Sequence, residues 1–133
     1  MNIAPLLHVP VSVKVHLVTV VPAFFIGTWQ IFVSRKGVTS HRALGYVYLG
    51  LMTITAVDAL FIHELNAPFG LTPIHLFVPL TLFGVVRALL AARRHDIQGH
   101  RNAMIMVYVG GILLAGSLTL LPGRILHAVV FGN

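Results

Sequence analysis

Cysteine is absent from the sequence. Its absence excludes disulfide bonds, thiolate metal sites, iron–sulfur clusters and covalently attached haem. A bound metal ion would therefore need histidine, carboxylate or methionine ligands. The signatures of common soluble enzymes are also missing, because the chain has no Gly-x-Gly-x-x-Gly, no P-loop, no Gly-x-Ser-x-Gly and no His-Glu-x-x-His. The sequence alone identifies no enzyme activity.

Charged residues are scarce. They make up 9% of the 133 residues, against about a quarter in soluble domains, while 57% of the residues are hydrophobic. The mean hydropathy is +0.92. Four continuous apolar stretches each approach the ~20 residues that a helix needs to cross ~30 Å of hydrocarbon. We therefore predict an all-α integral membrane four-helix bundle, a single domain over residues 1–133 with spans at about 11–33, 44–63, 73–92 and 103–121 and an interfacial tail at 122–133.

Acidic residues are rarer still, with three carboxylates against nine basic residues and a formal net charge of +6. Most of the basic residues lie in or beside two turns, at Arg35, Lys36 and Arg42 and at Arg87, Arg93, Arg94 and Arg101. The positive-inside rule then predicts that both turns lie in the cytoplasm and that both termini lie on the outer side of the membrane. The lipid bilayer is the expected partner, and homo-oligomers stay open. Nucleic-acid binding is not expected, because the sequence has no soluble domain that could place a helix or strand in a nucleic-acid groove.

The two basic turns resemble each other in sequence. SRKGVTSHR, residues 34–42, and RRHDIQGHR, residues 93–101, end in His41-Arg42 and His100-Arg101. The same offset of 59 residues (100 − 41) also relates His16 to His75 (75 − 16). We therefore predict two tandem helical hairpins in the same orientation, related by a pseudo-two-fold axis along the membrane normal. Equivalent histidines would then face each other, near the outer side for one pair and near the inner side for the other.

Facing imidazoles can ligate both axial positions of a haem iron, and helical bundles house cofactors between facing helices. The leading hypothesis is a haem b protein for transmembrane or membrane-associated electron transfer. His16 and His75 would be the outer ligands, and His41 and His100 are the candidate inner ligands. Arg42 and Arg101 could pair with the haem propionates. A quinone or a partner oxidoreductase would exchange the electrons. The competing structural interpretation places the inner histidines in the headgroup region.

A second set of residues suits a bare metal ion. Asp58 and His63 lie toward the outer end of the second span, the level expected for His16 and His75. Three imidazoles and a carboxylate would suit Zn, Cu or Fe in an enzymatic or metal-handling site. The structural alternative is an ion pair between Asp58 and a histidine that ties the second span to its neighbours. A third hypothesis is a noncatalytic membrane accessory subunit.

Three stretches, LTPIHLFVPL, ARRHDIQGHRNAM and GSLTLLPGRILHAVVFG, resemble the family of small bacterial membrane proteins called domain of unknown function 2306. The resemblance covers about residues 27–132 and implies a four-span integral protein of the bacterial inner membrane, without an established activity. The family pattern has small polar residues where Val57-Asp58-Ala59 stand here. More distantly, the layout of histidine pairs at two levels is similar to that of two-haem membrane cytochromes b. The stretch HRALGY, residues 41–46, is also similar to the histidine-plus-glycine signature of those cytochromes.

Overall fold

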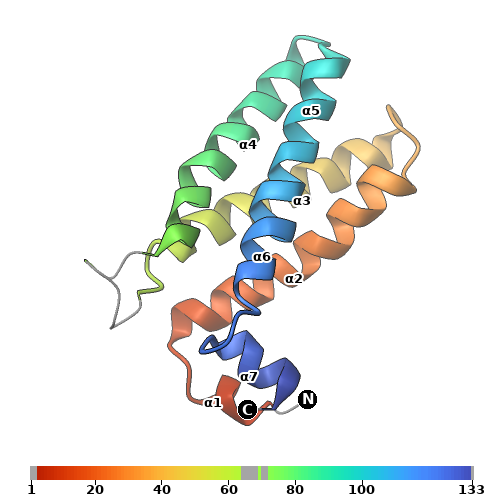
Figure 1. Ribbon diagram of the computed structural model, residues 1–133. Coiled ribbons are helices and arrows are strands. Elements are labelled where there is room, and N and C mark those ends of the chain that lie inside the picture. Colours follow the sequence, from red (N-terminus) through yellow and green to blue (C-terminus); the bar gives the residue numbers. More distant parts are fainter. Residues whose placement is uncertain (1–2, 64–68, 70–71, 133) are drawn as a thin grey trace.

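The structure is a computed structural model that describes residues 3–63, 69 and 72–132. Every regular element in this part of the chain is helical, so the prediction of an all-α protein is confirmed. The elements, drawn in Figure 1, are α1 (Ala4–Leu7), α2 (Val11–Phe32), α3 (Thr39–Ala59), η2 (Pro73–Leu76), α4 (Phe77–Arg93), α5 (Ile97–Tyr108), η3 (Val109–Leu114), α6 (Ala115–Leu118) and α7 (Ile125–Phe131).

Two antiparallel helix pairs make up most of the molecule (Figure 1). Helix α2 packs against α3, and α4 packs against α5, while α3 joins the two pairs by packing against α4. Helices α5, η3 and α6 follow one another as a single rod. The short helices α1 and α7 contact each other at the end of the molecule where both termini lie. We call this the terminal end, and the opposite end, with the turns after α2 and α4, the corner end.

Three helical stretches of the described chain are long and apolar enough to cross a membrane: Val11–Phe32, Pro73–Arg93 and Ile97–Leu118. They correspond to three of the four predicted spans. Helix α3 has 21 residues but is not among them. Its first turn carries His41 and Arg42 and its last turn carries Asp58, which lowers the mean hydropathy over its length.

Where a helix meets a polar turn, its observed end differs from the end that the apolar stretch predicts. Helix α3 begins at Thr39, before the predicted start at 44, and ends at Ala59, before the predicted end at 63. Helix α5 begins at Ile97 rather than at 103, because the carboxylate of Asp96 accepts a hydrogen bond of 2.8 Å from the Gly99 amide and caps the helix. Hydropathy locates the apolar part of a helix, and capping residues set its ends.

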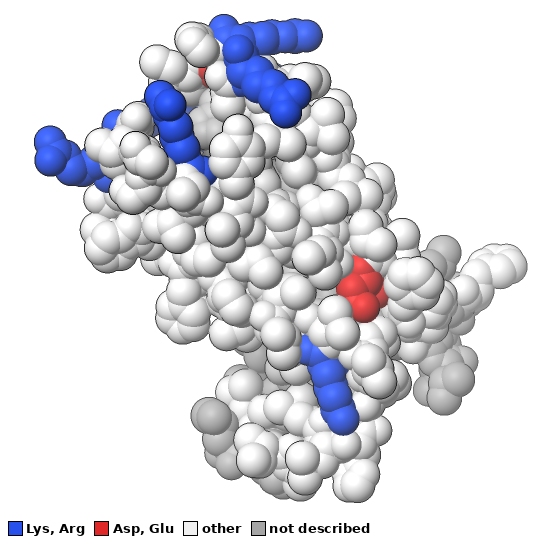
Figure 2. Space-filling view, turned by 180° about the vertical axis from the view of Figure 1, so that it is seen from behind, with Lys and Arg blue, Asp and Glu red and all other residues white. Residues whose placement is uncertain are grey.

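Each turn at the corner end contains one residue in the left-handed backbone region, Gly37 with φ +84° and His95 with φ +58°. In the first turn Lys36 Nζ donates hydrogen bonds to the carbonyls of Gln30 and Ile31. The basic residues of both turns gather at this end, above a surface that is otherwise almost without charge (Figure 2).

The core lies where the two helix pairs meet. Tyr48, Met52 and Val107 are its largest fully buried side chains. Close packing depends on small residues there, because a Cβ atom at Gly84 would lie 2.5 Å from Val107 Cγ2. This core holds the four long helical segments in fixed register and so positions the histidines at both ends.

Candidate functional site

His41 and His100 both lie at the corner end. Each lies in the first turn of its helix, α3 or α5, and both side chains are half-buried. The two imidazoles are near enough for the charge of His100 to act on His41. We call these two residues the corner pair.

Both rings of the corner pair are anchored through the same nitrogen. His41 Nδ1 lies 3.0 Å from the Ser34 hydroxyl oxygen, and His100 Nδ1 lies 2.9 Å from the carbonyl oxygen of Ala88. Neither Nε2 has a hydrogen-bond partner among the residues that the structure describes. A histidine with an anchored Nδ1 and an available Nε2 has the arrangement that metal-ligating histidines adopt.

The backbone around His41 is also held in place. Gln30 Nε2 donates a hydrogen bond of 2.7 Å to the His41 carbonyl, and Gln30 is almost fully buried in α2. Burial lowers the pKa of the His41 imidazole below its ordinary value, and the charges of Lys36 and His100 lower it further. His41 precedes the apolar stretch that begins at Leu44, so it lies outside the membrane-spanning part of the chain. The neutral form, which is the form that ligates metals, is favoured.

Arg42 and Arg101 follow the corner pair directly and are both exposed. Neither has a hydrogen-bond or ion-pair partner in the described part of the chain. Two guanidinium groups are therefore available beside the corner pair for an anionic ligand.

The outer histidines are not arranged as a facing pair. His16 on α2 lies beside Asp58 on α3, with 3.9 Å between Nδ1 and Oδ2. That separation allows an ion pair but exceeds a hydrogen bond, and both atoms are buried without a partner within the described residues. We call these two residues the outer dyad.

His75 instead stabilises the start of the second helix pair. Its Nδ1 accepts a hydrogen bond of 3.1 Å from the Thr72 amide and so caps η2, and its Nε2 lies 3.0 Å from the Ile62 carbonyl oxygen. Its ring is also 6.2 Å from that of His63. Both ring nitrogens of His75 are therefore already engaged.

A cavity of about 110 Å³ opens beside the outer dyad. Residues of α2, α3, α4, η3, α6 and α7 line it, with polar groups from His16, Thr55, Thr81 and Thr119 among mostly apolar side chains. For comparison, a cavity of about 150 Å³ holds one benzene ring. This cavity has room for a few water molecules and not for a porphyrin.

The helix wall of this cavity is irregular. Val109–Leu114 forms a π-helix between α5 and α6, and its Gly111 lines the cavity. A Cβ atom at Gly111 would lie 2.7 Å from Met52 Cε and 3.0 Å from Thr81 Oγ1. Isolated π-helical turns are rare and occur often at functional sites. Neither the cavity nor this segment was predicted from the sequence, although the pair Gly110-Gly111 is a signal for a weak point in the helix.

The four residues of the predicted metal site fall into two groups: His16 with Asp58, and His63 with His75. Among the described residues no three His, Asp or Glu side chains lie close enough to hold a metal ion. Glu64 is outside the residues described here. A metal ion at the outer dyad would have to take its remaining ligands from hydroxyl groups or solvent.

Comparison with known proteins gives one family. A family model described as "Predicted membrane protein (DUF2306)" matches residues 13–130. No significant match was found among curated proteins or among solved structures. The match covers all the histidines discussed above and most of the chain.

Proposed function

The chain belongs to the predicted membrane protein family DUF2306, and on that premise we propose that it is a four-span bundle of two tandem hairpins in the bacterial inner membrane. In this proposal α3 contains the fourth span, which begins at Leu44, after His41. Helix α3 packs between α2 and α4. The basic corner end faces the cytoplasm, and the terminal end faces the periplasm.

We propose further that the protein binds haem b at the corner end and carries electrons within or across the membrane. His41 and His100 would hold the iron through Nε2. The observation that carries this proposal is what the two histidines share: both stand at the corner end on different helix pairs, and each is held by a hydrogen bond at Nδ1 with Nε2 available. Arg42 and Arg101 would pair with the propionates.

The corner pair supports this role better than the outer histidines do. Both ring nitrogens of His75 contact backbone groups. The cavity beside His16 is smaller than a cavity that holds one benzene ring, and a porphyrin is much larger than benzene. A macrocycle between His16 and His75 would require the two helix pairs to separate. When bound, the haem would exchange single electrons with a quinone or a partner oxidoreductase.

The test is the visible spectrum of the detergent-purified protein after expression with ample haem. We expect a Soret band that is lost in His41→Ala and in His100→Ala but kept in His8→Ala, because His8 is exposed and far from the corner end. Size-exclusion profiles show whether each variant is folded. A folded wild-type protein without a Soret band, or a band that survives both corner substitutions, rejects the proposal.

The alternative function, an outer-face metal site for Zn, Cu or Fe, is supported only by the unpartnered atoms of the outer dyad. Elemental analysis of the same preparation tests it. Stoichiometric metal without porphyrin, lost in His16→Ala, would favour this site. If neither haem nor metal is present, the remaining proposal is a noncatalytic membrane accessory subunit.

A further inference from the structure

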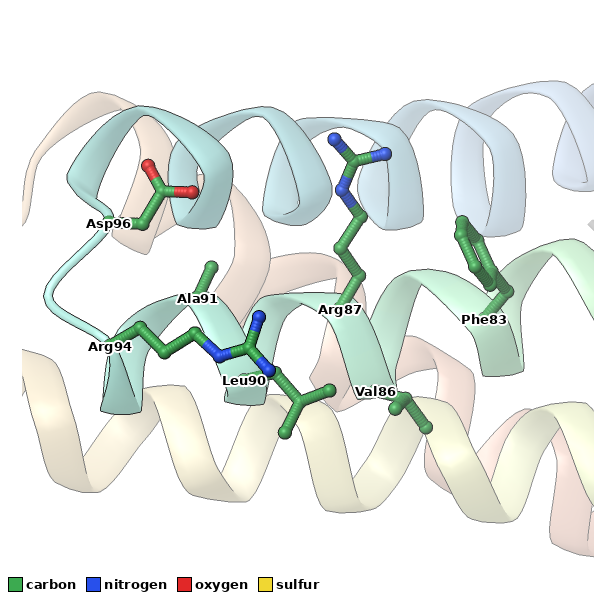
Figure 3. Close-up of a pocket in the computed structure, with 7 residues that line it drawn as sticks. All are labelled: Phe83, Val86, Arg87, Leu90, Ala91, Arg94 and Asp96. Atoms are coloured by element: carbon green, nitrogen blue, oxygen red, sulfur yellow. The ribbon is translucent and has the colours of Figure 1, made fainter.

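Beyond the histidines, the outer surface of α4 carries an open pocket of about 250 Å³ near the corner end. Figure 3 shows the residues that line it: Phe83, Val86, Arg87, Leu90, Ala91, Arg94 and Asp96. The pocket combines two cations with an apolar floor. We propose that it binds an anionic phospholipid, with the phosphate between Arg87 and Arg94 and the acyl chains along α4.

The two arginines are positioned for one ligand. They are seven residues apart, which is about two helical turns and roughly 10 Å along the axis, so they share a face of α4. In Figure 3 the Arg94 side chain lies along α4 toward Leu90, and the Arg87 side chain extends from α4 toward α5. Neither guanidinium has a hydrogen-bond or ion-pair partner in the described part of the chain.

The position of Arg87 favours an anionic partner. It lies inside Pro73–Arg93, a helical stretch apolar enough to cross a membrane, and it is exposed. An unpaired arginine below the headgroup level is costly unless it reaches a counter-charge. A lipid phosphate at the interface supplies that charge, and a bidentate guanidinium contact suits its geometry.

The floor of the pocket suits the lipid tails. Phe83, Val86 and Leu90 recur at helical spacing and are 59%, 54% and 44% exposed. Asp96 adds a negative charge at the rim, but its carboxylate caps α5 by accepting the Gly99 amide proton. Two arginines and one carboxylate leave the pocket with a net charge of +1, which favours an anionic headgroup over a zwitterionic one.

Native mass spectrometry of the purified protein with added phosphatidylglycerol tests the site. We expect Arg87→Gln with Arg94→Gln to weaken lipid retention by roughly tenfold or more. The matched control is Arg35→Gln with Arg93→Gln, which removes the same charge from exposed positions outside the pocket. The control should retain lipid like the wild type. The pair Arg87→Lys with Arg94→Lys, which keeps the charge, should keep most of the binding.

Three results would overturn the proposal. Equal losses in the pocket and control variants would show that lipid binds through general surface charge. Equal retention of phosphatidylcholine and phosphatidylglycerol would remove the preference for an anionic headgroup. Competition by millimolar inorganic phosphate that abolishes lipid retention would show that the pocket takes a free anion. None of these measurements depends on haem, so they stand apart from the test of the corner pair.

Discussion

His16 Nδ1 on α2 lies 3.9 Å from Asp58 Oδ2 on α3, and neither of these buried atoms has a hydrogen-bond partner among the described residues. Buried polar atoms are normally paired, and leaving one unpaired costs about 1–3 kcal/mol. On this argument we expect the outer dyad to lower the stability of the fold rather than to raise it.

This view predicts that an apolar replacement stabilises the protein. His16→Phe combined with Asp58→Leu should raise the free energy of unfolding by about 1–3 kcal/mol, because buried charge pairs with poor geometry are often less stable than packed hydrophobic residues. Thermal unfolding in detergent measures the change, and the two single variants complete a double-mutant cycle. A clear loss of stability in the double variant would instead assign the dyad the role of tying α2 to α3.

His41 predicts a pH dependence of stability. Its pKa is lowered from the ordinary 6.5 in the folded protein, so the unfolded chain takes up a proton at a higher pH than the folded chain does. The free energy of unfolding should therefore rise with pH between the lowered pKa and 6.5, and that contribution is lost as the pH falls. Denaturation of the haem-free protein over this range measures the slope.

His41→Gln is the matched variant for this effect. It keeps a polar side chain but removes the titrating group, so the stability should vary less with pH than in the wild type. Lys36 and His100 both stay in the variant, so only the His41 contribution is removed. An unchanged slope in His41→Gln would mean that another group causes the pH dependence.

The sequence predicted the helical class and three of the spans because apolar length alone determines them. It could not predict where the histidines of different helices meet. Periodicity fixes the face of a residue within one helix, whereas contacts between helices depend on packing. The equivalence of His16 and His75 in sequence did not lead to equivalent surroundings, because His75 lies in η2 and caps it while His16 lies inside α2.

The location of His41 and His100 at the corner end follows directly from the sequence, unlike the contacts of the outer histidines. His41 and His100 each stand in the first turn of a helix that follows a short connecting turn. The connecting turn therefore fixes their position along the bundle axis, and the helical periodicity fixes the face on which each side chain lies. The anchors of their Nδ1 atoms were not predictable. Ala88 contributes only a backbone carbonyl, which no sequence pattern marks. Ser34 lies in the turn before α3, outside the helix that carries His41.

Close packing at Gly84 gives a prediction for the core. A Cβ atom there would lie 2.5 Å from Val107 Cγ2 and 2.8 Å from Met106 Cε, so Gly84→Ala should destabilise the contact between α4 and α5 by about 1–3 kcal/mol. Gly50→Ala is the control, because Gly50 lies in α3 with no atom within 4 Å of an added Cβ. It should be neutral or slightly stabilising. Thermal unfolding in detergent compares the two, and equal stability would contradict the close approach of the helices.

Ser34 gives the sharpest test of how the corner pair is held. Its hydroxyl lies 3.0 Å from His41 Nδ1, and second-shell partners of this kind typically change the affinity for a bound metal by about 10–100-fold. Ser34→Ala should therefore weaken haem retention by about tenfold while the protein stays folded. Ser40→Ala is the matched control, because Ser40 is exposed and its hydroxyl makes no hydrogen bond among the described residues.

Titration of the haem-free protein with hemin, followed at the Soret band, measures the haem affinity of Ser34→Ala and of Ser40→Ala. If Ser34→Ala and Ser40→Ala bind equally well, the hydroxyl does not orient the ligand. Loss of binding in both would indicate a general defect in the turn between α2 and α3. A selective loss in Ser34→Ala is expected only if the His41 ring must be held at Nδ1 for its Nε2 to reach the iron, since no other described side chain anchors that nitrogen.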